Sequence, residues 1–312
     1  MLIPREERSK YTAFAEELSK ELKSVSIPPN TRLWHYTNGS AVISILDSMS
    51  LYSTHISCLN DSSELRYASK LFREALAKLI PKISSNPASH AFLKRAINYF
   101  AEDPTTPAQI SAHQFVACFS TEKDDLSQWR AYGGGENGYA IGFNAGDLWG
   151  SKYSMLARIS YDPSLHTRLA HEAAERMVQF FQEGIVKCDP SDHAQWEEEF
   201  LQAWELTLTL VAPLVKDPAF IKENECRIVK SISSDELIDL KFLQRSNMMS
   251  RHLPLRPPMR TPSTPYRLPI AEIIIGPCRH PQVSRLSVDT LLQQKGYTGV
   301  PVSISKIPFQ TT

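Results

Sequence analysis

The sequence predicts an α+β fold with a central mixed β-sheet flanked by helices. Runs of β-branched and aromatic residues mix with longer segments of helical periodicity, without the regular alternation of a doubly wound sheet. Hydrophobic residues make up 42% and charged residues 22% of the 312 residues, which is ordinary for a globular protein with a buried core. The predicted strands are 32–37, 51–59, 115–119, 139–143, 157–161, 225–230, 270–275 and 300–304.

The predicted helices fall into an N-terminal arm and two insertions. Apolar residues recur at helical spacing near the N-terminus and again in two long internal segments. We therefore expect a helical arm over residues 1–30 and a single α+β domain over 31–312. The two helical insertions in that domain are expected at about 62–110 and 164–216.

A basic, proline-rich segment lies late in the chain. Residues 241–271 contain no Asp or Glu, and six prolines fall between 254 and 269. Because proline removes a backbone donor and interrupts helices and strands, we expect a long loop over about 244–269. A solvated surface loop is one interpretation, and a basic lid over an anionic substrate is the other. The arginines expected to contact a ligand or a partner, either protein or nucleic acid, are Arg251, Arg256 and Arg260.

Charge and cysteine content restrict the class of protein. The 34 Lys and Arg residues balance the 34 Asp and Glu residues, which argues against general capture of nucleic acid or anionic membrane. The N-terminus does not resemble a secretory signal, and no apolar run approaches the length of a membrane span. The five cysteines are odd in number and widely spaced, unlike a disulfide framework or a zinc site. We expect a cytoplasmic, metal-independent protein with reduced cysteines and no membrane partner.

Two motif-like runs fail because of their context. Residues 133–138 match G-x-G-x-x-G, but a predicted helix precedes them and a strand follows, the reverse of the order in a dinucleotide-binding unit. Residues 171–175 approach the zincin helix, but Glu175 stands where the second His is needed. The first run is predicted to be a helix cap with a turn, and the second a solvated helix face.

Several polar and aromatic residues are candidates for a site. His35 and Tyr36 end an early strand and point to opposite faces of it. Glu225 and Arg227 lie two apart on a strand and share a face, where a salt bridge on the solvent side is the alternative to a site role. Asn60 precedes a helix start, and helix capping also explains its surroundings. Further candidates, on a strand and the short aromatic helix after it, are Ser120, Gln128, Trp129 and Tyr132.

These segments, in this order, resemble a bacterial family known as domain of unknown function 2971. The blocks that carry the resemblance are 33–37, 59–61, 118–120, 128–129, 138–143, 225–228 and 273–277. In the family the block at 225–227 usually reads Glu-Trp-Arg, and here Cys226 replaces the Trp. The blocks span most of the chain.

That family in turn resembles, more distantly, the ADP-ribosyltransferase fold. The resemblance implies an enzyme that uses NAD as a substrate and transfers ADP-ribose to an unknown acceptor. By the same resemblance, His35 holds a ribose hydroxyl and Glu225 acts as the catalytic carboxylate at the nicotinamide ribose. Either Tyr139 or Tyr52 stacks on the nicotinamide. The remaining residues expected to contact NAD are Tyr36, Ser120 and Arg227, with Arg130 or the basic loop as alternatives for the pyrophosphate.

The implied chemistry makes an architectural prediction. Cleavage of the nicotinamide–ribose bond passes through an oxocarbenium-like state, which a carboxylate stabilises without a metal. His35, Ser120, Tyr139 and Glu225 are therefore expected to line one cleft. The alternative function is a non-catalytic module of the same fold that senses a ligand or binds protein or nucleic acid. Convergence of His35 and Glu225 in one pocket would favour the enzyme.

Overall fold

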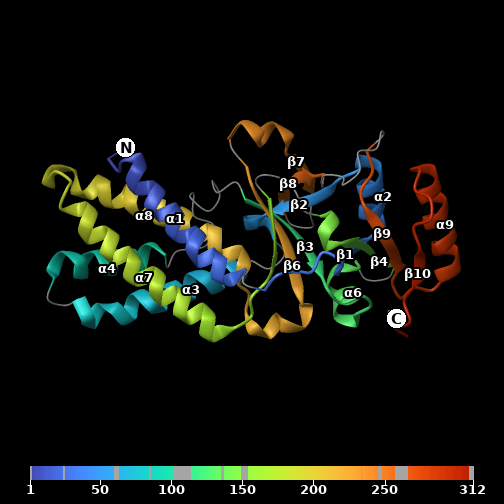
Figure 1. The fold of residues 1–312 in the computed structure, drawn as a ribbon, viewed down its shortest axis with the longest axis horizontal. Coiled ribbons are helices and arrows are strands. Elements are labelled where there is room, and N and C mark those ends of the chain that lie inside the picture. The colour runs from blue at the N-terminus through green and yellow to red at the C-terminus, as the bar shows by residue number, and fades with distance from the viewer. Residues whose placement is uncertain are drawn as a thin grey trace. The chain divides into compact units, whose positions relative to one another are not determined.

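The computed structural model describes the chain as two compact units (Figure 1). The described residues are 2–23, 25–59, 63–83, 86–100, 114–134, 137–148, 154–232, 234–244, 248–256 and 266–308. A helical unit consists of Met1–Val25, Ile56–His113 and Ile159–Phe220. A sheet unit consists of Ser26–His55, Gln114–Arg158 and Ile221–Thr312. The chain thus differs from the single domain with a separate arm that the sequence predicted.

The helical unit is held together by aromatic side chains from distant parts of the sequence. Its helices are α1 (Arg5–Leu22), α3 (Ser63–Leu79), α4 (Pro87–Tyr99), α7 (Pro163–Ile185) and α8 (His193–Val211). Phe14 of α1 stacks on Trp204 of α8 with 6.0 Å between ring centroids, and Phe92 of α4 stacks on Phe181 of α7 at 3.8 Å. Because these contacts bury the apolar faces of the arm and of both insertions, the three segments form one unit.

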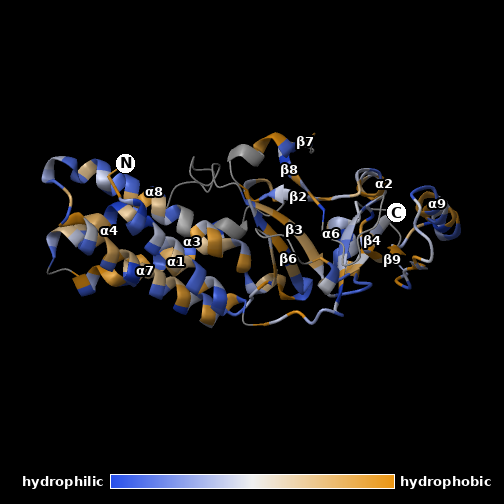
Figure 2. Cartoon of the chain, turned by 45° about the horizontal axis from the view of Figure 1, so that its top comes forward, coloured by the Kyte–Doolittle hydropathy of each residue, from blue (hydrophilic) through white to orange (hydrophobic). Residues whose placement is uncertain are grey.

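Each helix of this unit carries one apolar face. Figure 2 shows hydrophobic and hydrophilic residues along α1, α3, α4 and α7 alike. In α1 the buried positions recur at helical spacing, from Tyr11 through Phe14 and Leu18 to Leu22. Among the described residues, no helix is both long and apolar enough to cross a membrane.

The sheet unit confirms the predicted mixed sheet flanked by helices. Its helices are α2 (Gly39–Ser48), α6 (Leu126–Tyr132) and α9 (Pro281–Gln294). Its strands are β1 (Arg32–Asn38), β2 (Leu51–His55), β3 (Gln114–Ser120), β4 (Gly138–Asn144), β5 (Ser154–Arg158), β6 (Glu225–Ser231), β7 (Lys241–Gln244), β8 (Met249–Leu255), β9 (Ile270–Ile275) and β10 (Val302–Ile304). The main order is β10-β9-β4-β1-β3-β2-β8-β7, with β6 on β3 and β5 on β6. The β9–β10 pair is parallel, and the other pairs are antiparallel.

Strand β3 is the centre of this sheet. Strand β6 pairs with it along its whole length. Its other edge is shared, since β1 pairs at one end, where Trp34 lies opposite Ser120, and β2 pairs at the other, where Thr54 lies opposite Val116. Strand pairing is therefore interrupted between β1 and β2, at the level of Cys118.

Helices cover both faces of the sheet. On one face, side chains of α2 and α9 join the main hydrophobic core, which includes Leu33, Phe119 and Phe143. On the other face, Trp129 of α6 packs with Trp34 and Tyr36 in a smaller cluster. We call these the core face and the α6 face. Figure 1 shows α9 beside β9 and β10.

The prediction of a loop over about 244–269 is wrong for residues 249–255. These residues form β8, which pairs with both β2 and β7. Pro254 lies opposite Tyr52 of β2 and beyond the residues of β8 that pair with β7. The pairing of β8 with β7 therefore needs no N–H from Pro254. Ser250, His252 and Leu253 are buried. Proline and arginine obscured a strand in which two buried positions, Ser250 and His252, are polar and two, Leu253 and Leu255, are apolar.

No disulfide joins any of the five cysteines in the structure. Cys58 and Cys226 are buried. Burial raises the pKa of the Cys226 thiol to about 11. A buried thiol of this kind acts as a small apolar group that fills space in the core.

Candidate functional site

Strand β6 carries a buried ion pair. Arg227 Nε donates to Glu225 Oε1 at 2.7 Å, and Arg227 Nη2 donates to Glu225 Oε2 at 2.8 Å. The two side chains are 1% and 6% exposed. The salt bridge expected on the solvent side as the alternative role is therefore wrong in its location, although the pairing of the two residues is correct. Two parallel hydrogen bonds fix the orientation of the carboxylate and balance its charge inside the protein.

The register of the sheet separates His35 from Glu225. Trp34 lies opposite Ser120, which in turn lies opposite Glu225, and cross-strand partners share a face. His35 is the next residue in β1 and points to the other face. Its ring lies 5.8 Å from that of Phe119, a member of the main core. The prediction that His35 and Glu225 line one cleft is wrong.

The two candidate tyrosines also lie on different faces. Tyr139 lies opposite Thr37 and packs against the main core, so it shares the core face with His35. Tyr52 lies opposite Pro254 and directly follows Leu51, which belongs to the main core. Because successive side chains of a strand point to opposite faces, Tyr52 lies on the α6 face with Glu225. The four residues expected in one cleft are thus divided, with His35 and Tyr139 on one face and Ser120 and Glu225 on the other.

His35 fills the interruption between β1 and β2. Its Nδ1 lies 3.0 Å from the carbonyl oxygen of Cys118, at the level of β3 where neither strand pairs. Since a carbonyl only accepts, Nδ1 carries the proton in this contact. Burial lowers the pKa of His35, which favours the neutral ring. The imidazole thereby supplies the carbonyl of Cys118 with the hydrogen-bond donor that a paired strand would otherwise provide.

Tyr36 and Trp129 organise the segment after β3. The hydroxyl of Tyr36 donates to the carbonyl of Glu122 at 2.7 Å, and Trp129 Nε1 donates to Asp124 Oδ1 at 2.8 Å. Their rings meet edge to face, with 4.6 Å between centroids. Burial raises the pKa of Tyr36 well above its ordinary value. Both side chains therefore hold a turn in place, and Asp125 then caps α6 by accepting from the backbone of Ser127 and Gln128.

Three other candidates converge on Glu223, a residue that the sequence did not single out as a site residue. Ser120 Oγ donates to the Glu223 carbonyl at 2.7 Å. Longer contacts of 3.5 Å join Gln128 Nε2 to that carbonyl and Tyr132 OH to Glu223 Oε1. Asn224, with a positive φ of 44°, then turns the chain into β6. In the sequence, Asn224 itself was the signal for this turn, because Asn adopts a positive φ more readily than most residues.

A second polar cluster lies on β8 and β2 and was missed. Ser250 Oγ lies 2.7 Å from His252 Nε2, and Thr54 Oγ1 lies 3.3 Å from His252 Nδ1. All three side chains are buried, and Ser250 Oγ also contacts the carbonyl of Leu243 at 3.2 Å. The period-two spacing of Ser250 and His252 would have shown that they share a face, had the segment been recognised as a strand.

The remaining candidates are basic residues and Asn60. Arg251 Nη2 lies 3.2 Å from Nδ1 of the buried His55, and Arg256 donates to the carbonyl of Ser48 at 3.2 Å. Asn60 and Arg260 lie outside the described residues. In the part of the chain that is described, no group of His, Cys, Asp and Glu is arranged to hold a metal ion.

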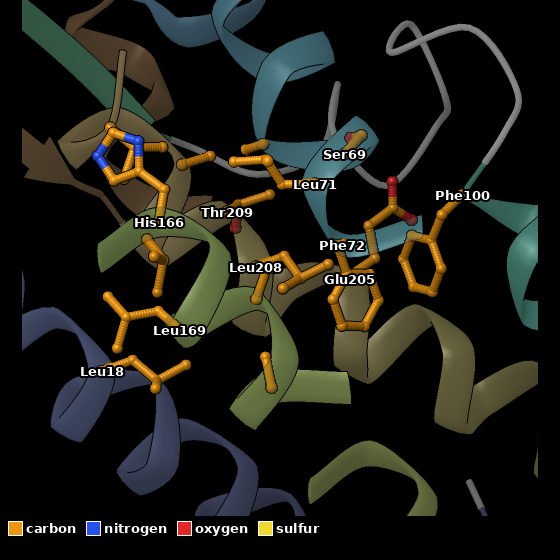
Figure 3. A pocket seen from close by; sticks show the side chains of 16 residues that line it. Leu18, Ser69, Leu71, Phe72, Phe100, His166, Leu169, Glu205, Leu208 and Thr209 are labelled. Carbon is orange, nitrogen blue, oxygen red and sulfur yellow. The ribbon is translucent and has the colours of Figure 1, made fainter. Parts of the chain in front are cut away.

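The helical unit contains a pocket that the sequence did not indicate (Figure 3). Its cavity of about 70 Å³ lies among side chains of α1, α3, α7 and α8. Most of the wall is aliphatic or aromatic. The polar residues in it are Ser69, His166, Glu205 and Thr209.

Known proteins give one family resemblance. No curated protein and no solved structure matches the chain. The family match begins in α6 and ends in β6, so it includes Glu225 and Arg227 but neither His35 nor the basic segment. Over residues 128–228, the chain is similar to the family described as "Protein of unknown function (DUF2971)".

Proposed function

We propose that this protein is a non-catalytic ligand-binding module. The observation that carries the proposal is the placement of His35 and Glu225 on opposite faces of the sheet, with Glu225 already paired to Arg227. Hydrogen bonds within the protein occupy four of the residues that the sequence nominated for chemistry, namely His35, Tyr36, Ser120 and Glu225. Such an arrangement favours a structural role for them.

The energetics of the ion pair support this proposal. A catalytic carboxylate acts by interacting more strongly with the transition state than with the ground state. Both carboxylate oxygens of Glu225 accept from Arg227. A substrate that took over these contacts would have to break a buried ion pair, which costs about 3–5 kcal/mol.

The pocket of the helical unit supports the binding part of the proposal. A largely apolar cavity with a few polar groups in its wall is the usual form of a small-molecule site. The lining residues come from distant parts of the sequence, so the cavity depends on the folded unit. A ligand there would stabilise the native state over the unfolded chain.

The first test is for catalysis. The purified protein is incubated with NAD, and nicotinamide is measured by chromatography. We expect no release above a buffer control, and equal results for wild type, Glu225→Gln and the control Glu272→Gln, whose carboxylate pairs with the exposed Lys123. Release by the wild type that falls about a hundredfold or more in Glu225→Gln alone would overturn the non-catalytic proposal.

ADP-ribosyl transfer is the second candidate function. The observation that favours it is the position of Tyr52, a candidate to stack on the nicotinamide, on the same face of the sheet as Glu225. In this candidate NAD is the substrate, Glu225 is the catalytic carboxylate, and Arg251 and Arg256 contact a protein or nucleic-acid acceptor. The nicotinamide assay decides between the two functions.

A further inference from the structure

We propose that the pocket of the helical unit binds a small, neutral, hydrocarbon-like molecule of a few carbon atoms. The inference rests on the proposed ligand-binding function and names the class of ligand. It is argued from the wall of the pocket, from the hydrogen bonds of its polar groups and from its size.

The wall offers mainly carbon to a ligand. Leu18, Leu169 and Leu208 contribute aliphatic surface, and Phe72 and Phe100 contribute rings (Figure 3). Burial of apolar surface against such a wall is favourable in proportion to the area removed from water. A polar ligand would lose its hydration and find few partners in return.

Both ring nitrogens of His166 already have hydrogen-bond partners within the protein. Its Nδ1 lies 2.9 Å from the hydroxyl of Tyr67, and its Nε2 lies 2.9 Å from Oγ of Ser160. The side chain is buried near the start of α7, which Asp162 caps by accepting from two backbone amides. Burial lowers the pKa of His166, which favours the neutral ring. This part of the pocket therefore favours an uncharged ligand.

The carboxylate in the wall also has a partner within the protein. Glu205 accepts a hydrogen bond from the hydroxyl of Tyr99 at 2.7 Å, and its side chain is buried. In Figure 3, Glu205 lies with Phe72 and Phe100 on one side of the pocket, and His166 lies on the other. Because His166 and Glu205 are separated and already hydrogen-bonded, the space between them favours an apolar occupant over ordered water.

The size of the cavity limits the ligand. A single water needs roughly 10–15 Å³ of such space, and an engineered apolar cavity of roughly 150 Å³ binds benzene. The present cavity, about 70 Å³, lies between these values. Xenon and branched hydrocarbons smaller than benzene are therefore suitable probes.

Binding is tested on the full chain by methyl NMR spectroscopy under xenon or isobutane. We expect saturable shifts at the methyl groups of Leu169 and Leu208, which line the pocket, and none at Leu93, which is buried elsewhere in the unit. Glycerol, a polar molecule of similar size, is expected to cause no saturable shift. Equal effects of glycerol and isobutane, or no effect of either gas, would overturn the assignment.

Two alanine variants of α7 provide the matched comparison. Ala173 lines the pocket, and its neighbour Ala174 is buried but does not. Ala173→Leu is expected to abolish the xenon shifts and to keep or raise the melting temperature, because the new side chain fills empty space. Ala174→Leu is expected to lower the melting temperature through overpacking. Xenon shifts that persist in Ala173→Leu contradict the proposed site.

The proposal and the function on which it rests fail in different ways. Release of nicotinamide from NAD would overturn the non-catalytic function and leave the pocket assignment standing. Absence of xenon and isobutane binding would overturn the pocket assignment, whatever the NAD assay shows.

Discussion

Arg227 binds both carboxylate oxygens of Glu225, two residues earlier on the same strand, and the pair is almost completely buried. The spacing places the two side chains side by side without any need for a turn or a second strand. A buried pair contributes little net stability compared with an apolar pair of similar volume, but removal of one partner is costly. The pair is thus a sensitive point of the sheet unit.

Arg227→Met should destabilise the protein by about 3–5 kcal/mol, because the buried carboxylate of Glu225 loses both hydrogen bonds from Arg227. The double variant Glu225→Leu with Arg227→Met should regain most of that loss. Urea unfolding measures both. Lys123→Met is the control, since Lys123 forms an exposed pair with Glu272 and should cost less than about 1 kcal/mol. A cost for Arg227→Met as small as that of the control would contradict the buried pair.

Stability should fall when the pH drops below about 6.5. Burial lowers the pKa of His35 and of His166 below the ordinary value of about 6.5, which the unfolded chain retains. Below that value the unfolded chain binds protons that the native rings do not, so these residues contribute stability above pH 6.5 that is lost as the pH falls toward their native pKa values. Urea midpoints at pH 7.5 and 5.5 measure the difference. His35→Gln with His166→Gln should show a smaller pH effect, and an unchanged one would exclude these two residues as its source.

Thiol titration should separate two classes of cysteine. In denaturant without reductant, five thiols should react, because none of the cysteines forms a disulfide in the structure. In the native state Cys58 and Cys226 should react slowly, since both are buried and the pKa of Cys226 is raised to about 11. Cys226→Ser should therefore leave the fast native phase unchanged. Recovery of fewer than five thiols in denaturant would indicate oxidation.

Arg251 and Arg256 should differ in their effect on stability. Arg251 belongs to β8 and contacts the buried His55, whereas Arg256 is exposed and contacts a carbonyl at the end of α2. Arg251→Ala should cost about 1–2 kcal/mol and Arg256→Ala less than about 0.5 kcal/mol. Melting temperatures of the two single variants provide the comparison. Equal, negligible shifts would restore the interpretation of this segment as a solvated loop.

The local pattern of apolar residues predicted many of the helices and strands. The apolar spacing around Phe14 and Leu18 located α1, and the aliphatic runs near Ile273 located β9. These signals are local, because each depends on the period of a single element. They do not state which helices pack together, and the division into two units was therefore missed.

The candidate site was harder to predict because it depends on register. The neighbouring positions of His35 and Tyr36 correctly placed them on opposite faces of β1. Nothing local specifies that Ser120 pairs with both Trp34 and Glu225, which decides the face of each candidate. The spacing of Glu225 and Arg227 likewise gives a shared face, but not whether that face is exposed.

The interleaving of the two units restricts how this protein can be divided. Three segments of each unit alternate along the chain, so the backbone passes from one unit to the other five times. A single proteolytic cut or truncation therefore cannot release either unit intact. Neither unit forms a contiguous cassette that recombination could transfer to another gene, and during synthesis neither can be completed before its third segment, 159–220 or 221–312, has been made. The helical unit and the sheet unit therefore have to be encoded and expressed together as one chain.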